Sequence, residues 1–362
     1  MKRKARWITL AFILAVASPV HQAMAYYKLI DLGILPGQEV SVAYSINNNG
    51  QIVGYTDKHP ELLVRPNPIA TLFDPTGGGN NIALCETVSQ ARSINNLGQI
   101  VGWAYDGSGK SRATLFDPTG SGNNINLGTL GGWVSIAYSI NNNGQIVGGA
   151  DGKATLFDPT GGGNNIDLGT LGGWVSIAYS INNNGQIVGG ADGKATLFDP
   201  TGGGNNIDLG SLGGGWSEAF SINDFGQIVG QFWVSSWESR ATLFDPTGGG
   251  NNIDLGALPG EWRRISLAFS INNLGQIVGT ADRRAVLFDP TGGGNNIDLN
   301  TLIDPSLGWT LTEAYSINDN GWIVGQGFSP DGDEHGYLLI PEPATLSLFA
   351  LAGLAILRKR RK

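Results

Sequence analysis

The sequence is poor in cysteine and in charged residues. Cys85 is the one cysteine among 362 residues, and Asp, Glu, Lys and Arg together make up 14% of the chain, against roughly 25% in an ordinary soluble domain. With a single thiol no internal disulfide can form. Stability must therefore come from a packed core and from contacts between different parts of the chain.

Signatures of catalysis are also missing. Beyond residue 25 the chain has two histidines, His59 and His335, and it shows no Ser–His–Asp set and no glycine-rich phosphate loop. We therefore predict no enzyme activity and no cofactor. A pair of carboxylates suited to glycoside chemistry would leave no trace in the spacing, so a polysaccharide-degrading enzyme stays open as the least favoured alternative.

No apolar run reaches the ~20 residues that a membrane-spanning helix needs. A shorter run, from Trp7 to Ala17, follows a basic start and precedes Ala23-Met24-Ala25. This order is typical of a secretory signal peptide. Residues 1–25 are predicted to be removed by signal peptidase, with Ala23 and Ala25 as the small residues of the cleavage site. An N-terminal anchor is the alternative.

The C-terminus, residues 341–362, has a second composite pattern. It reads Pro341-Glu342-Pro343, then an apolar segment over 344–357, then five basic residues that include Arg358, Arg360 and Arg361. This order resembles the PEP-CTERM sorting signal of Gram-negative bacteria. The resemblance implies transient insertion of a short helix in the inner membrane and processing by an exosortase-type enzyme. A plain tail anchor is the alternative, for which 14 apolar residues are short.

The two end segments hold much of the positive charge. Nine of the 22 basic residues but only one of the 30 acidic residues lie in them, so the part between carries 13 basic and 29 acidic residues, a net charge of −16. Such a surface repels phosphate backbones. Nucleic acid is therefore not predicted as a partner.

Glycine, by contrast, is abundant, at 56 residues, about twice the usual share of roughly 7%. The phrase S-I-N followed by G-x-I-V-G occurs seven times, at spacings of 48, 46, 41, 41, 49 and 46 residues. Its asparagines are Asn47, Asn95, Asn141, Asn182, Asn223, Asn272 and Asn318. A period in the forties indicates a repeat architecture.

Each repeat has room for four strands. In the third, strands are predicted over 136–142, 145–150, 153–157 and 166–171, and the dipeptides Asn143-Gly144 and Asp151-Gly152 predict type I′ hairpin turns. The segment D-P-T-G-G-G-N-N, residues 158–165, predicts a loop in which the Asp forms the turn. No segment keeps a 3.6-residue period over three turns, so helices are not predicted.

Four-stranded units at this period are typical of a β-propeller. The seventh repeat contains three predicted strands, over 313–318, 322–327 and 337–340, and lacks a fourth. A matching strand, Y-Y-K-L-I-D-L-G at 26–33, follows the predicted signal peptide. We therefore predict an all-β, seven-bladed propeller over residues 26–340, whose last blade is completed by the N-terminal strand. An open β-solenoid is the alternative.

Residues 128–168 and 169–209 are identical, which indicates a tandem duplication. The repeat, A-Y-S-I-N-N-N-G-Q-I-V-G with D-L-G-T-L-G-G, resembles the HAF repeat of bacterial extracellular proteins. One departure is that Lys or Arg stands where that motif has its histidine, as in Lys153, Lys194 and Arg240. The resemblance implies an exported location and carries no activity.

Tryptophan gathers in two kinds of turn, which alternating strands would place on one face of the disc. It occupies the connectors between repeats at Trp133, Trp174, Trp216, Trp262 and Trp309, and the turns between second and third strands at Trp103, Trp233 and Trp237. Four of these second turns are predicted to be long loops, over 55–68, 103–111, 232–239 and 327–336. Indoles on a rim would suit sugar binding; alternatively, the connector tryptophans fill the seams between blades.

The nearest approach to a metal motif is D-G-D-E-H-G, residues 331–336, in which His335 stands where a calcium loop has Asn or Asp. We interpret it as a polar hairpin turn and predict no metal. Asp224 and Asp319 break the sevenfold pattern of the first turns. The sequence thus favours a non-catalytic envelope or matrix protein that binds exopolysaccharide or another surface component, ahead of a scaffold for protein partners.

Overall fold

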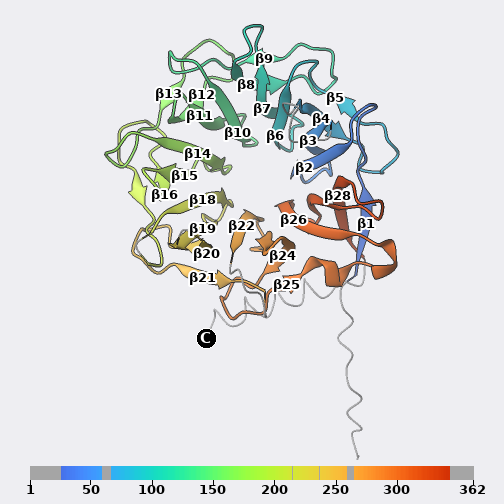
Figure 1. Ribbon diagram of the computed structural model, residues 1–362. Coiled ribbons are helices and arrows are strands. Elements are labelled where there is room, and N and C mark those ends of the chain that lie inside the picture. Colours follow the sequence, from blue (N-terminus) through green and yellow to red (C-terminus); the bar gives the residue numbers. More distant parts are fainter. Residues whose placement is uncertain (1–25, 59–66, 214, 236, 259–264, 343–362) are drawn as a thin grey trace, which may run out of the picture.

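The computed structural model describes residues 26–58, 67–213, 215–235, 237–258 and 265–342. These residues form seven four-stranded antiparallel sheets, arranged as blades around a central axis (Figure 1). The predicted seven-bladed β-propeller is confirmed, and the open solenoid is wrong.

The first strand of each blade lies nearest the axis (Figure 1). Blade 1 contains β2 (Val40–Ile46), β3 (Ile52–Asp57), β4 (Ile69–Phe73) and β5 (Ile82–Ala83). Blade 2 contains β6 (Ser89–Ile94), β7 (Ile100–Tyr105), β8 (Ser111–Phe116) and β9 (Ile125–Asn126). Blade 3 contains β10 (Ser135–Ile140), β11 (Ile146–Ala150), β12 (Lys153–Phe157) and β13 (Ile166–Asp167). Blade 4 contains β14 (Ser176–Ile181), β15 (Ile187–Ala191), β16 (Lys194–Phe198) and β17 (Ile207–Asp208).

The remaining blades follow the same order. Blade 5 contains β18 (Ser217–Ile222), β19 (Ile228–Ser235), β20 (Glu238–Phe244) and β21 (Ile253–Gly256). Blade 6 contains β22 (Ser266–Ile271), β23 (Ile277–Ala281), β24 (Arg284–Phe288) and β25 (Ile297–Asp298). Blade 7 contains β26 (Thr310–Ile317), β27 (Ile323–Phe328), β28 (Glu334–Pro341) and β1 (Tyr27–Asp31). Two 3₁₀ turns, η1 (Leu299–Leu302) and η2 (Pro305–Leu307), connect blade 6 to blade 7.

The ring closes as predicted, through the N-terminal strand. β1 pairs antiparallel with β28, with Leu29 opposite Leu339. Tyr27 and Leu32 at the two ends of this segment are buried. Since consecutive strands alternate in direction, the first and third turns of every blade share one side of the disc, the first-turn face. The second turns and the connectors share the other side, the second-turn face.

The core lies in the seams between blades. Val147 of β11, for example, packs in one cluster with Ala178 and Ile181 of the next blade. Each blade therefore has a partner on both faces, which explains why its strands are apolar on both sides. The glycine of I-V-G has a separate cause: a Cβ on Gly148 would lie 2.0 Å from the carbonyl oxygen of Ile136, so only glycine allows the two strands to approach this closely.

One of the two predicted hairpin turns is confirmed and the other is wrong. Asp151 and Gly152 both have positive φ, 53° and 80°, as a type I′ turn requires. At Asn143-Gly144 only the glycine has a positive φ, of 77°. The side chain of Asn141 is the reason, because its Oδ1 accepts the backbone N–H groups of Asn143 (3.0 Å) and Gln145 (2.9 Å) and fills the turn from inside.

Three of the predicted long second-turn loops are also wrong. In blade 2, β7 continues to Tyr105 and β8 begins at Ser111. In blade 5, β19 continues to Ser235 and β20 begins at Glu238. In blade 7, β27 continues to Phe328 and β28 begins at Glu334. These insertions form longer hairpins because their backbone groups continue the antiparallel ladder. The corresponding segment of blade 1 lies partly outside the described residues.

Candidate functional site

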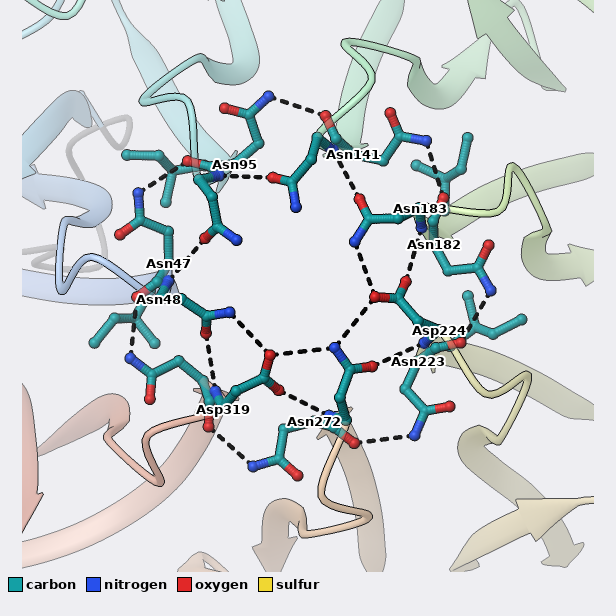
Figure 2. A pocket seen from close by; sticks show the side chains of 18 of the residues that line it. Asn47, Asn48, Asn95, Asn141, Asn182, Asn183, Asn223, Asp224, Asn272 and Asp319 are labelled. Carbon is teal, nitrogen blue, oxygen red and sulfur yellow. Dashed lines mark hydrogen bonds between the residues drawn. The ribbon is translucent and has the colours of Figure 1, made fainter.

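The seven motif asparagines form a circular hydrogen-bond network at the mouth of the central channel (Figure 2). In blade 4 the Oδ1 of Asn182 accepts the backbone N–H groups of Asn184 (3.1 Å) and Gln186 (2.9 Å), while its Nδ2 donates to the carbonyl oxygen of Asn223 in the next blade (2.9 Å). Every blade repeats this arrangement, and Asn318 closes the circle on Asn47 (3.0 Å). The motif therefore joins neighbouring blades.

The next residue of each blade forms a second, inner ring. The backbone N–H of Asn183 donates to Oδ1 of Asp224 (2.9 Å), and the same bond is made from blade to blade around the ring. Its members are Asn48, Asn96, Asn142, Asn183, Asp224, Asn273 and Asp319. They line a cavity of about 180 Å³.

Two carboxylates meet in this cavity although 95 residues separate them in the sequence. Asp224 and Asp319 each accept a hydrogen bond of 3.2 Å from Nδ2 of Asn273. Asn183 and Asn48 donate further bonds to them, of 2.9 Å and 2.8 Å (Figure 2). Both carboxylates thus replace asparagine as acceptors from N–H groups. Within the described residues neither is hydrogen-bonded to another carboxyl with which it would share a proton.

A ring of larger side chains lines the first strands behind the asparagines. Neighbouring rings contact each other at centroid distances of 5.1–6.1 Å, through Tyr138, Tyr179, Phe220, Phe269, Tyr315 and Tyr44. Blade 2 has Arg92 in this place, with its guanidinium 4.4 Å from the Tyr44 ring centroid and 5.9 Å from that of Tyr138. Cation–π contacts therefore complete the circle where the aromatic residue is missing.

The connector tryptophans on the second-turn face are largely exposed. The exposed fractions are 70% for Trp133, 87% for Trp174 and 73% for Trp216, so the seam-filling interpretation is wrong for these three. Trp309 does fill a seam, because it packs against the core of blade 7. Trp262 lies outside the described residues.

The exposed connectors are held in place by the second turns. The carboxylate of Asp151 accepts backbone N–H groups of Leu130, Gly132 and Trp133, at 3.1, 2.9 and 2.6 Å. Asp192 does the same for Trp174. Partial burial opposes ionisation of Asp151, but these N–H donors outweigh it and lower its pKa. The indoles therefore project from a fixed backbone.

The three tryptophans predicted in second turns differ in environment. Trp237 lies at the tip of the β19–β20 hairpin and is 86% exposed, whereas Trp233 lies within β19 and is 38% exposed. Trp103 is inside β7, where its Nε1 donates to Gln90 (3.3 Å) and its ring contacts Tyr105. Trp103 and Trp233 are therefore strand residues, and their placement in turns is wrong.

The D-G-D-E-H-G segment is a hairpin. His335 lies in β28, and its Nδ1 is 3.0 Å from Oδ2 of Asp31 in β1. The residues that the structure describes contain no cluster of three or more His, Cys, Asp or Glu side chains able to hold a metal ion. His335 instead links the two strands that close the ring.

This link makes closure pH-dependent. The hydrogen bond to Asp31 raises the pKa of His335 above its ordinary value near 6.5. The stabilisation is therefore complete below about pH 6.5 and is lost as the pH rises through the raised pKa. We expect it to contribute about 0.5–1 kcal/mol, since the pair is partly exposed. Amide exchange in residues 27–31 should be slower at pH 6 than at pH 9 after correction for intrinsic rates. His335→Gln should remove the difference; an unchanged difference would contradict the assignment.

The sorting-signal residues lie at the end of this closing strand. Pro341 is the last residue of β28 and is paired with Tyr27, and the N–H of Glu342 donates to the carbonyl oxygen of Tyr26 (3.0 Å). Pro343, Arg358, Arg360 and Arg361 lie outside the described residues, as do Ala23 and Ala25 of the predicted cleavage site. The part of the chain that the structure describes has no helix of sufficient length and hydrophobicity to cross a membrane.

Solved structures resemble this chain only distantly. The gluconolactonase XC5397 from Xanthomonas campestris is 10% identical, with 90% of this chain and 94% of that chain covered and a TM-score of 0.43. TolB from Acinetobacter baumannii is 13% identical (80% and 63% covered, TM-score 0.44), and the Trypanosoma rangeli sialidase is 11% identical (89% and 59%, TM-score 0.41). No activity is inferred from similarities this low.

Sequence comparison adds one assignment. No curated protein matches the chain. The model of the PEP-CTERM protein-sorting motif matches residues 339–362. The C-terminal segment predicted from its Pro-Glu-Pro triplet is therefore confirmed as a PEP-CTERM motif, which marks the protein for export to the cell envelope and for processing by an exosortase.

Proposed function

We propose that this protein is a non-catalytic component of the bacterial envelope or extracellular matrix that binds polysaccharide, or another surface component, through the indoles of its second-turn face. The observation that carries the proposal is the exposure of Trp133, Trp174 and Trp216 on three successive connectors. Tryptophan is highly buried on average, and exposed apolar side chains gathered on one face mark interaction sites. The resemblance of the repeats to HAF repeats of extracellular proteins supports the same location.

Indole rings suit sugars because the C–H face of a pyranose stacks on a flat aromatic surface while its hydroxyls bond nearby polar groups. The second-turn face has both kinds of group. The indole of Trp174 is exposed, and Lys110 lies over the Trp133 ring, with Nζ 3.7 Å from its centroid. The net charge of −16 between the two end segments favours a neutral polymer over an anionic one.

A scaffold for protein partners is the second candidate, and one observation favours it. On the first-turn face, Leu97, Phe225 and Leu274 are exposed at the position where other blades have an asparagine bonded to the next blade. Apolar side chains there would suit a protein interface. A polysaccharide-degrading enzyme is the least supported, because Asp224 and Asp319 act as acceptors within the asparagine ring.

The test is binding to the exopolysaccharide of the producing organism. The double substitution Trp174→Ala with Trp237→Ala is expected to weaken binding roughly 10–100-fold, since each aromatic contact contributes about 0.5–1.5 kcal/mol. Phe225→Ala, which removes an aromatic side chain of similar exposure from the opposite face, is the matched control and should leave affinity unchanged. Affinity electrophoresis and calorimetry would measure both.

Two results would reject the proposal. One is that the native protein fails to bind the polymer; the other is that the tryptophan variant binds it as tightly as the native protein. Weakened binding by Phe225→Ala alone would instead place the interface on the first-turn face and favour the scaffold.

A further inference from the structure

A second cavity, of about 390 Å³, opens between blades 3 and 4 on the second-turn face. Its walls come from the first strands of adjacent blades, with Ile136 and Tyr138 on one side and Ile177 and Tyr179 on the other. Glu218 of blade 5 also lines it. Val134 and Val175, which directly follow the exposed Trp133 and Trp174, also line the cavity and are themselves exposed.

The cavity exists because of a missing side chain. The residue after I-V-G is Gly149 in blade 3 and Gly190 in blade 4, whereas the other blades have Tyr55, Trp103, Gln231, Thr280 and Gln326. The backbone does not require glycine at 149, since its φ is not positive and an added Cβ would meet only ordinary contacts, the nearest being Ile177 Cγ1 at 3.5 Å. Gly149 thus leaves space that the fold would allow a side chain to fill.

The duplicated blade does not repeat the same surroundings. Beside Gly190 the next first strand carries Glu218 where blade 4 carries Ile177, and an added Cβ on Gly190 would meet Glu218 Cγ at 3.7 Å. Trp216 also packs over the neighbouring Gly193, 3.4 Å from its added Cβ. Blades 3 and 4 have the same residues, yet Gly149 lines the cavity and Gly190 does not.

Few polar groups face this aliphatic space. Glu218 accepts a hydrogen bond from Nε2 of Gln231 (2.9 Å), which leaves lone pairs on its carboxylate for further donors. The Tyr138 hydroxyl makes no hydrogen bond within the described part of the chain. The carboxylate oxygens of Asp151 are already occupied by backbone N–H groups.

We propose that this cavity binds one neutral sugar residue carrying an apolar substituent, such as an acetyl or methyl group, with adjoining residues of the polymer stacked on Trp133 and Trp174. This inference rests on the proposed function and names its specificity. The aliphatic wall of Ile136 and Ile177 takes the methyl group, and Glu218 and Tyr138 bond sugar hydroxyls. A uronic acid is rejected because none of the described residues that line the cavity is a cation able to pair with it, and the Glu218 carboxylate repels it.

The test fills the cavity with a side chain that the fold already uses elsewhere. Gly149→Gln introduces the residue of blades 5 and 7, and Gly190→Gln makes the same change in the duplicated blade, in identical local sequence. Calorimetric titrations would use an N-acetylglucosamine trisaccharide, an unsubstituted β-glucan trisaccharide and a galacturonic acid trisaccharide. Thermal unfolding would verify that both variants are folded.

The native protein is expected to bind the acetylated trisaccharide at least 10-fold more tightly than the other two. Gly149→Gln should weaken that binding at least 10-fold, and Gly190→Gln by less than 2-fold. The cavity assignment is overturned if the native protein binds the three trisaccharides with equal affinity. It is also overturned if Gly149→Gln binds the acetylated trisaccharide as tightly as the native protein does. If the double substitution Trp174→Ala with Trp237→Ala still weakens binding of the native polymer in that case, the proposed function stands. If the native protein binds neither the polymer nor any of the trisaccharides, both the cavity assignment and the proposed function are overturned.

Discussion

Removal of residues 26–33 from the mature protein is expected to cost most of its stability. These residues form the strand β1 and bury Tyr27 and Leu32, and their loss leaves the edge of β28 unpaired. Full burial of two such side chains contributes about 3–6 kcal/mol, and the loss of the strand pairing adds to this. Domains have only about 5–15 kcal/mol in total. Urea unfolding of the truncated and full mature proteins would measure the difference.

Complementation provides the control for this experiment. A synthetic peptide of residues 26–33 added in trans should restore the unfolding transition, because its strand pairs with β28 without covalent linkage. A peptide of the same composition in scrambled order should not. An unchanged unfolding midpoint in the truncated protein would contradict closure by this strand.

Asn182→Ala is expected to destabilise the propeller by about 2–4 kcal/mol. The substitution removes the acceptor for two backbone N–H groups of its own turn and the donor to the carbonyl oxygen of Asn223. Asn182 is buried, and each buried polar group left without a partner costs about 1–3 kcal/mol. Denaturant unfolding, with the slope compared between variants, would measure the effect.

The same turn offers a matched control. Asn184 is exposed and donates one hydrogen bond, to the carbonyl oxygen of Asp224 (2.7 Å), so Asn184→Ala should cost less than about 1 kcal/mol. Asn182→Asp keeps the acceptor and loses the donor to the next blade, and an intermediate loss is expected. Equal effects of Asn182→Ala and Asn184→Ala would show that the asparagine circle does not join the blades.

Much of the fold was determined by local sequence. The seven occurrences of the S-I-N phrase set the number of blades, and the lone strand at 26–33 predicted the closure. The turn at Asp151-Gly152 was predicted because two consecutive positive φ angles suit those residues. The turn at Asn143-Gly144 was not, since its form depends on the side chain of Asn141 inside it.

The candidate sites depended on contacts between repeats. Trp174 and Trp309 both stand in connectors, yet one is exposed and the other is packed, because η1 and η2 give the connector before blade 7 a different path. Asp224 and Asp319 break the pattern in sequence, but only the closed ring brings both carboxylates to the amide of Asn273.

The duplicated blades separate most clearly what the sequence determines from what the tertiary structure decides. By itself the sequence determined that blades 3 and 4 fold alike, because identical residues have identical local preferences. Only the tertiary structure decided that Gly149 lines the cavity between blades 3 and 4 and that Gly190 does not, since the next blade presents Ile177 to the first and Glu218 to the second. Strand pairing follows the chain, whereas a binding surface between blades depends on which side chains the neighbouring blade provides.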